Sequence, residues 1–396
     1  MKRLKNFYFI VLLISCFEAH ATELPPIKIG VSSPVTGGSY SMGIGLRNGI
    51  RIAADEINAA GGVLGRKIQL VERDDQANPD LGLKQAEDLV KNEKVIAVVG
   101  YSNTGVILKC GHLYQEAKIP LMLGGAVGTK LTKIYQDQAE NYFFRTAPRD
   151  EVQSIMIVRE ALEKRGFKKV ALLTDTTPYG VLGREDLLQA LNKYQMVPVS
   201  DEKFKVGDTD MMPQLSKAKA AGAECILVYG IGPELAHIAI DMKKLGWNNA
   251  LIGCQNLAQS SFIEKSGKDG VGACMPQSFI QAGNSKKRKW FIETYMENFN
   301  PSQRRMESAM SSAQGYDSLK ILAAGIEQAG STDGSKIVNA LENLNATIDG
   351  IITTYSRPYS HTDHEAVEEE ATVMGMVRQG RVVYAYREDA VRANAQ

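Results

Sequence analysis

Apolar residues recur along this chain in two alternating patterns. Residues 27–31 form a short apolar run typical of a buried strand, and the next segment has apolar residues spaced along one helix face (Leu46, Ile50, Ala53, Ile57). The pair of patterns then repeats. Strands are expected at 27–31, 67–73, 95–99 and 120–123, and helices at 80–92, capped by Asp80, and at 105–117. Strands that alternate with helices predict a parallel sheet covered by helices on both faces.

A second unit with the same pattern follows Thr146. Its expected helices are 152–165, 180–194, 211–221 and 233–245, and its expected strands are 169–174, 225–229, 250–253 and 271–276. Further helices are expected at 290–299, 306–329 and 335–344, and short strands at 351–355, 371–378 and 381–384. The later helices fit either unit. The pattern therefore predicts an α/β protein with two doubly wound domains of parallel sheet.

Composition supports an ordinary globular protein without a nucleic-acid partner. Hydrophobic residues make up 44% of the 396 positions and charged residues 23%, with a net charge of +1. The densest basic cluster, 286–289, opens an amphipathic helix, where a solvated helix start explains it better than a nucleic-acid patch.

The first 21 residues have the pattern of an export signal. A basic start precedes the apolar run 7–14, which is too short to span a bilayer, and 19–21 offer a small-x-small cleavage pattern. We therefore expect a periplasmic protein. An alternative cleavage before Cys16 would leave a lipid-anchored protein. Outside the cytoplasm there is no ATP or NADH, which disfavours cofactor-dependent enzymes.

Ligands of open parallel sheets bind beyond the carboxyl ends of the strands, so the loops there are the candidate site. Ser102, Asn103 and Thr104 follow an apolar strand and begin a helix, where hydroxyls and free N–H groups favour an anion. A plain N-cap is the alternative reading. The glycine-rich loop 124–128 has few side chains, so its backbone can approach a ligand closely. Tyr179 is an aromatic residue with a hydroxyl, which suits the wall of a ligand cleft.

Other candidate chemistry is weaker. Residues 43–49 resemble a dinucleotide fingerprint but miss its spacing by one residue, and no Walker sequence is present. His361, Asp363 and His364 could ligate a metal, but their polar, acidic surroundings favour a solvated loop. We therefore expect no cofactor, no metal site and no catalytic residue.

These features resemble the Leu/Ile/Val-binding family of periplasmic binding proteins, the receptors of ABC importers with the type I binding-protein fold. The residues that carry the resemblance are 27–30, 54–62 (ADEINAAGG), Asp74 and Asp75, Gly100 with Thr104, 144–146, and Asp175 with Tyr179 and Gly180. The resemblance covers essentially the whole mature chain. Its motifs are specific to the superfamily rather than to one ligand.

The resemblance implies a three-segment hinge, with crossings near 147–149, 277–279 and 350–352. The first domain would comprise 22–147 plus 278–350, and the second 148–277 plus 351–396.

The resemblance also implies a ligand site in the interdomain cleft. In amino-acid receptors of the family, the loop matched by Thr104 holds the α-carboxylate, and the carbonyl position matches Gly125. The hydroxyl and the acid that hold the ammonium fall on Val127 and Gln255, which carry no charge. The full expected ligand-binding set is Tyr40, Ser102, Asn103, Thr104, Gly125, Ala126, Val127, Tyr179, Gly230 and Gln255. A carboxylate ligand without an α-ammonium, such as an organic or aromatic acid, is therefore expected.

Three function classes are weighed. The first is a monomeric transport receptor that presents a small molecule to the permease subunits of an ABC importer. The second is a ligand-sensing subunit of the same fold. An ordinary branched-chain amino-acid receptor is the alternative for the ligand. The third, a secreted hydrolase, lacks any apparent Ser/His/Asp arrangement, and the mature chain has only His112, His237, His361 and His364.

Cys254 ends one expected strand, and Cys274 lies near the end of the next. If those strands are parallel neighbours, the two residues lie level and within bridging distance. A Cys254–Cys274 disulfide is therefore expected, with two buried thiols as the alternative.

Overall fold

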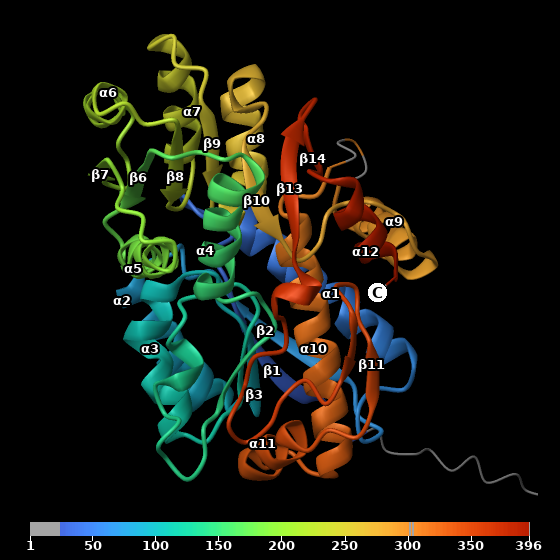
Figure 1. Cartoon of the computed structure of the whole chain (residues 1–396). Coiled ribbons are helices and arrows are strands. Elements are labelled where there is room, and N and C mark those ends of the chain that lie inside the picture. The colour runs from blue at the N-terminus through green and yellow to red at the C-terminus, as the bar shows by residue number, and fades with distance from the viewer. Residues whose placement is uncertain (1–23, 301, 303–304, 396) are drawn as a thin grey trace, which may run out of the picture.

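The computed structural model describes residues 24–300, 302 and 305–395, and Figure 1 shows two lobes with a sheet in each. The expected export signal and the Cys16 tether lie outside these residues. Within the described part of the chain, no helix is both long enough and apolar enough to cross a bilayer.

The first lobe is built on five parallel strands in the order β2-β1-β3-β4-β5. The strands are β1 (Ile27–Ser32), β2 (Ile68–Arg73), β3 (Ala97–Gly100), β4 (Leu121–Leu123) and β5 (Phe143–Arg145). Its helices are α1 (Tyr40–Ala59), α2 (Pro79–Asp88), α3 (Thr104–Glu116), α9 (Lys286–Phe299), α10 (Ala309–Ala329) and α11 (Gly334–Glu342). Gly49 allows α1 to lie against α10, because a Cβ there would lie 1.9 Å from the Ser312 carbonyl oxygen.

The second lobe is built on seven strands in the order β14-β13-β10-β9-β8-β6-β7. They are β6 (Val170–Asp175), β7 (Ser200–Phe204), β8 (Cys225–Tyr229), β9 (Ala250–Gly253), β10 (Cys274–Gln277), β13 (Val373–Arg378) and β14 (Arg381–Tyr384). Its helices are α4 (Asp150–Arg159), α5 (Pro178–Asn192), α6 (Met212–Ala220), α7 (Glu234–Lys244), α8 (Ser260–Ser266) and α12 (Arg387–Ala395). β13 pairs antiparallel with β10, and β14 antiparallel with β13, so only the other part of this sheet is parallel.

Some local expectations differ from the structure. β5 and β7 were not expected, because β5 has only three residues and the polar edge strand β7 (SDEKF) lacks an apolar run. Asn78, not Asp80, caps α2: its side chain accepts from the backbone N–H groups of Asp80 and Leu81.

The segment after residue 350 belongs to the first core. β11 (Thr347–Asp349) and β12 (Thr354–Ser356) form a separate two-stranded sheet. Apolar side chains of this segment pack in the core of the first lobe, among them Ile351, Ile352, Tyr355, Tyr359 and Val367. The tail joins the second sheet only at β13. We therefore propose that the last crossing between domains lies near residues 368–372 rather than near 350–352.

The expected Cys254–Cys274 disulfide is wrong, because both residues are free, buried thiols. Their strands are parallel neighbours, but Cys274 pairs with Ile252, so Cys254 lies two residues further along. That offset puts the two Cα atoms about 8 Å apart, beyond bridging distance. The Cys254 thiol instead donates to the Gly230 carbonyl at 3.4 Å.

Candidate functional site

The backbone at the end of β3 turns sharply before the expected anion site. Tyr101 adopts a left-handed conformation with φ of 57°, which is uncommon for a residue with a side chain. Its ring is fully buried, its hydroxyl lies 2.7 Å from the Tyr114 hydroxyl, and its N–H donates to the Ser32 carbonyl. These contacts fix the loop that carries Ser102, Asn103 and Thr104.

The start of α3 keeps its N–H groups free of side-chain caps. Asn103 is the N-cap residue, but its side chain makes no capping bond and instead donates to Ser39 Oγ at 3.1 Å. Uncapped N–H groups and the helix dipole favour an anion at this end. Thr104 Oγ1 accepts from the Gly128 N–H at 3.3 Å, which leaves the hydroxyl proton for another acceptor. Ser102 Oγ is buried without a hydrogen-bond partner in the described structure.

The loop 124–128 packs directly against this helix start. A Cβ on Gly125 would lie 3.2 Å from Ser102 Cα, and the Ala126 N–H donates to the Tyr101 carbonyl at 2.9 Å. Val127 packs instead in the core of the second lobe. The structure therefore brings Gly125 and Ala126 together with the start of α3, whereas Val127 packs in the apolar cluster that also contains Tyr179.

The second lobe contributes buried polar atoms without partners. Gln255 is 1% exposed, and neither atom of its side-chain amide has a hydrogen-bond partner among the described residues. Its backbone is held, since the N–H donates to Gln153 Oε1 and the carbonyl accepts from Gln277 Nε2, both at 3.1 Å. The Tyr179 hydroxyl is also buried without a hydrogen-bond partner among the described residues, and the Tyr179 and Tyr229 ring centroids lie 5.0 Å apart.

Two further expected site residues, Gly230 and Tyr40, lie in a loop and at a helix start. The Gly230 carbonyl accepts from Asn256 Nδ2 at 2.8 Å, which fixes the loop beside Gln255. Tyr40 begins α1 and is half-buried, next to the Ser39 hydroxyl that receives the Asn103 amide.

The two lobes touch around this site, which we call the lobe junction. A Cβ on Gly105 of α3 would lie 3.3 Å from Pro178 Cγ of α5, so the starts of these helices face each other. A Cβ on Gly232 would similarly lie 3.3 Å from the Gly38 carbonyl oxygen. The two lobes therefore meet at these helix starts and loops, and the candidate residues Thr104, Tyr179 and Gln255 are each buried.

Sequence reasoning missed Asp150, a fully buried carboxyl at the start of α4. One of its oxygens accepts from the Tyr229 hydroxyl, and the other has no partner within the described chain. Burial raises the pKa of Asp150 to about 8. The sequence did offer one signal for this residue, because Asp150 directly follows the first expected crossing between the domains, near 147–149.

The two histidines considered above as possible metal ligands, His361 and His364, contact other protein groups instead. His364 is buried, with Nδ1 2.7 Å from the Phe143 carbonyl oxygen and Nε2 3.2 Å from Glu342. His361 lies 3.3 Å from the same Glu342. Across residues 24–300, 302 and 305–395, no group of three or more His, Cys, Asp or Glu is arranged to hold a metal ion.

Known proteins share both the sequence pattern and the fold. The pattern of the periplasmic binding protein family matches residues 26–380. The leucine-, isoleucine-, valine-, threonine-, and alanine-binding protein of Pseudomonas aeruginosa is 26% identical over 336 residues, covering 84% of this chain and 86% of that protein.

Solved structures extend the comparison. The substrate binding protein LivJ of the branched-chain amino acid transporter from Streptococcus pneumoniae, in complex with isoleucine, is 25% identical with a TM-score of 0.78, covering 90% of this chain and 97% of LivJ. A solute binding protein of an ABC transporter from R. palustris, in complex with benzoate, shares the fold at 18% identity with a TM-score of 0.78, covering 91% and 95%. Since the family pattern spans nearly all of the described chain, this chain belongs to the periplasmic binding protein family.

Proposed function

We propose that this protein is the periplasmic receptor of an ABC importer and binds a small carboxylate between its lobes. The observation that carries this proposal is the uncapped start of α3, where Thr104 has a hydroxyl proton to donate and Ser102 Oγ has no partner. Such a site binds a carboxylate through N–H and hydroxyl groups without a cation. It binds and releases its ligand unchanged, acts as a monomer, and delivers the ligand to the permease subunits.

We infer the ligand class from the buried polar groups that the second lobe offers at the lobe junction. A buried ammonium needs a charged, hydrogen-bonded partner. Gln255 offers only a neutral amide, and the raised pKa of Asp150 keeps that acid protonated at neutral pH. Asp175 is occupied, since it accepts from the Thr177 hydroxyl and from the N–H groups of Thr177 and Ile231. We therefore propose an organic or aromatic acid that lacks an α-ammonium.

The named relatives favour a second candidate, an ordinary branched-chain amino-acid receptor. The Pseudomonas aeruginosa relative is named for leucine, isoleucine, valine, threonine and alanine, and the LivJ structure holds isoleucine. A sensing subunit of the same fold is a third candidate. Genes for a permease and an ATPase beside this one would favour transport over sensing.

A thermal-shift screen of the purified full-length protein separates the ligand classes. The panel contains benzoate, 4-hydroxybenzoate, small aliphatic acids, leucine, isoleucine and valine. A ligand at 100 times its Kd adds about 2.7 kcal/mol of stability, which is readily detected. Stabilisation by an acid without an ammonium supports the proposed class, whereas stabilisation by the branched-chain amino acids alone would replace it with the second candidate. Mass spectrometry of the denatured protein identifies any ligand retained from the cell.

A further inference from the structure

The backbone of Gly128 connects the proposed carboxylate site to a buried arginine. Its N–H donates to Thr104 Oγ1 at 3.3 Å, and its carbonyl accepts from Arg145 Nη1 at 2.8 Å. Arg145 Nη2 also donates to the neighbouring Thr129 carbonyl at 3.3 Å. One side chain therefore holds two successive carbonyls of the loop that borders the site.

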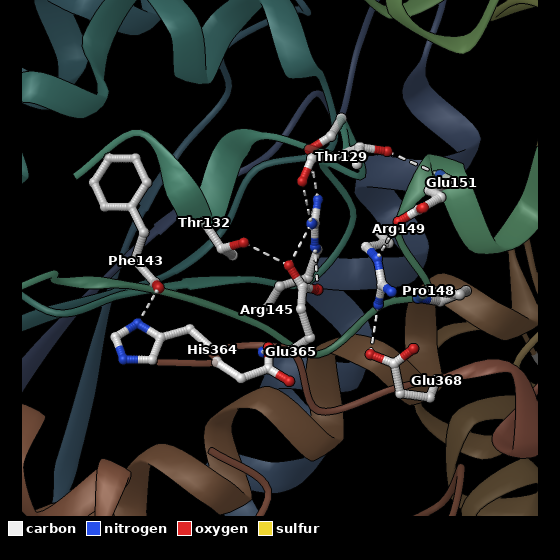
Figure 2. A network of polar contacts seen from close by, with 12 residues as sticks. Thr129, Thr132, Phe143, Arg145, Pro148, Arg149, Glu151, His364, Glu365 and Glu368 are labelled. Carbon is white, nitrogen blue, oxygen red and sulfur yellow. Dashed lines mark hydrogen bonds and ion pairs between the residues drawn. The ribbon is translucent and has the colours of Figure 1, made fainter. Parts of the chain in front are cut away.

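Arg145 is itself fixed on every side. It is fully buried, and its Nε donates to Glu365 Oε2 at 2.7 Å while Nη2 donates to Glu365 Oε1. Thr132 donates its hydroxyl to the same carboxylate. Figure 2 shows the Arg145 side chain between Thr129 and Glu365, with Thr132 on the same carboxylate. The backbones also pair, since Arg145 N–H donates to the His364 carbonyl at 2.9 Å.

This arrangement has a direct consequence for the Thr104 hydroxyl. A charged donor on the Gly128 carbonyl fixes the orientation of the peptide between Gly128 and Thr129. The preceding peptide shares the Gly128 Cα, so its N–H, which donates to Thr104, is held in place as well. The N–H occupies an acceptor position on Thr104 Oγ1, so the hydroxyl proton turns toward a different acceptor. The fit is close, because a Cβ on Gly128 would lie 2.7 Å from Thr104 Cγ2.

The same loop also contacts the second lobe. The Val127 carbonyl accepts from the Asp150 N–H at 2.9 Å. The Thr129 hydroxyl donates to Asp186 Oδ2 at 2.7 Å and accepts from the Glu151 N–H at 2.8 Å. Residues 127–129 are thus bonded to Thr104, to Arg145, to the start of α4 and to Asp186 in the middle of α5.

We propose that Arg145, held by Glu365, is a positioning residue for carboxylate recognition. It holds the backbone on the carbonyl side of Gly128, and thereby the Gly128 N–H, so that the Thr104 hydroxyl donates its proton to the ligand carboxylate. The bidentate pair thus supports an anion site in which no formal cation touches the ligand. This inference rests on the proposed function, because it assigns the Thr104 hydroxyl to a carboxylate.

A double-mutant cycle in the full-length protein tests this role. Calorimetry with benzoate and with isoleucine measures binding to the wild type, Arg145→Lys, Thr104→Ala and the double variant. Lysine cannot reproduce the bidentate fork, so Arg145→Lys is expected to weaken binding of the acid that the wild type accepts by about tenfold. In the Thr104→Ala background the same change is expected to cost less than about twofold. If the double variant loses affinity by the product of the two single-variant factors, the two residues act independently, and the proposal is overturned.

Arg149→Lys is the matched control. Arg149 lies four residues after Arg145 and pairs with Glu368 and Glu151, but among the described residues its side chain makes no hydrogen bond to residues 127–129. It is expected to leave the affinity within about twofold of the wild type. If Arg145→Lys fails to fold, the pair Arg145→Met with Glu365→Leu replaces the buried ions by apolar groups, a change that buried pairs elsewhere tolerate. An equal effect of Arg149→Lys on affinity would contradict a specific role of Arg145.

Amide exchange at Gly128, followed by NMR, separates this inference from the proposed function. Protection of this N–H is expected in the wild type and in Arg149→Lys, and at least tenfold faster exchange in the Arg145 variants. Unchanged exchange in the Arg145 variants would overturn the positioning role. Failure of the wild type to bind either acid would instead overturn the proposed ligand class, and the role in recognition with it, whatever the exchange result.

Discussion

Ser41 Oγ of α1 and Ser260 Oγ of α8 lie 2.9 Å apart and join the two lobes by a hydrogen bond. The Ser261 N–H also donates to Ser41 Oγ at 3.3 Å. Neither helix start can move away from the other without breaking these bonds. These bonds therefore hold the two lobes together at this point.

The first prediction concerns this closure. The ligand-free protein is expected to open at the Ser41–Ser260 contact, because the buried, unpartnered atoms of Ser102 and Gln255 then regain water. Saturation with the ligand that emerges from the thermal-shift screen should lower the radius of gyration in small-angle scattering. Identical scattering with and without that ligand would count against a clamshell mechanism.

The second prediction concerns Thr104. Thr104→Ala removes the hydroxyl that we assign to the carboxylate and should weaken binding by about 1.5–3 kcal/mol, the range for a hydrogen bond to a charged group. Calorimetry measures the loss. The exposed Thr362→Ala serves as the control and should leave the affinity unchanged. Equal affinities for wild type and Thr104→Ala would remove this residue from the site.

The third prediction uses the sign of one substitution. Gln255→Glu places a negative charge opposite the carboxylate site, so it should weaken binding of a simple acid by about tenfold or more. For a ligand with an α-ammonium the same change should be neutral or favourable. Gln255→Met, which is similar in size and uncharged, controls for packing. Tighter binding of leucine by Gln255→Glu would restore the ordinary amino-acid receptor.

The fourth prediction concerns Asp150 and pH. Burial raises its pKa from 3.8 to about 8, with Tyr229, Asp186 and Arg145 as its ionisable neighbours. Between these values the folded protein holds a proton that the unfolded chain has released, so stability should fall as the pH rises from 5 to 8. The slope from this group is at most about 1.4 kcal/mol per pH unit.

Asp150→Asn keeps the hydrogen bond from Tyr229 but cannot ionise. Urea unfolding at several pH values should therefore show a smaller loss of stability between pH 5 and 8 than in the wild type. Parallel pH profiles for the two proteins would assign the dependence to other groups.

The fifth prediction concerns the thiols. Cys110, Cys225, Cys254 and Cys274 are free and buried, and burial raises their pKa values to about 11 for Cys254 and about 12 for the others. The thiolate is the reactive form, so alkylation should be slow in the native protein and reach all four after denaturation. Non-reducing peptide mapping that recovers a Cys254–Cys274 crosslink would contradict the structure.

The sequence by itself determined the α/β fold and the position of most elements. β8 and β9 match their expected ranges to the residue, because each is a buried apolar run between breaks in the pattern. It also placed Thr104 at a helix start after a strand, since both signals are local.

The tertiary structure decided what depends on distant residues. Strand register placed Cys254 two residues beyond the position level with Cys274, which spacing in the chain does not encode. Packing assigned 351–367 to the first core, although the segment follows an expected crossing. The bonds of Gly128 to Thr104 and Arg145 likewise span 24 and 17 positions of the chain. Hydrophobic periodicity reports the environment of each residue, but only the folded chain brings separate segments into the register and contact that make a site.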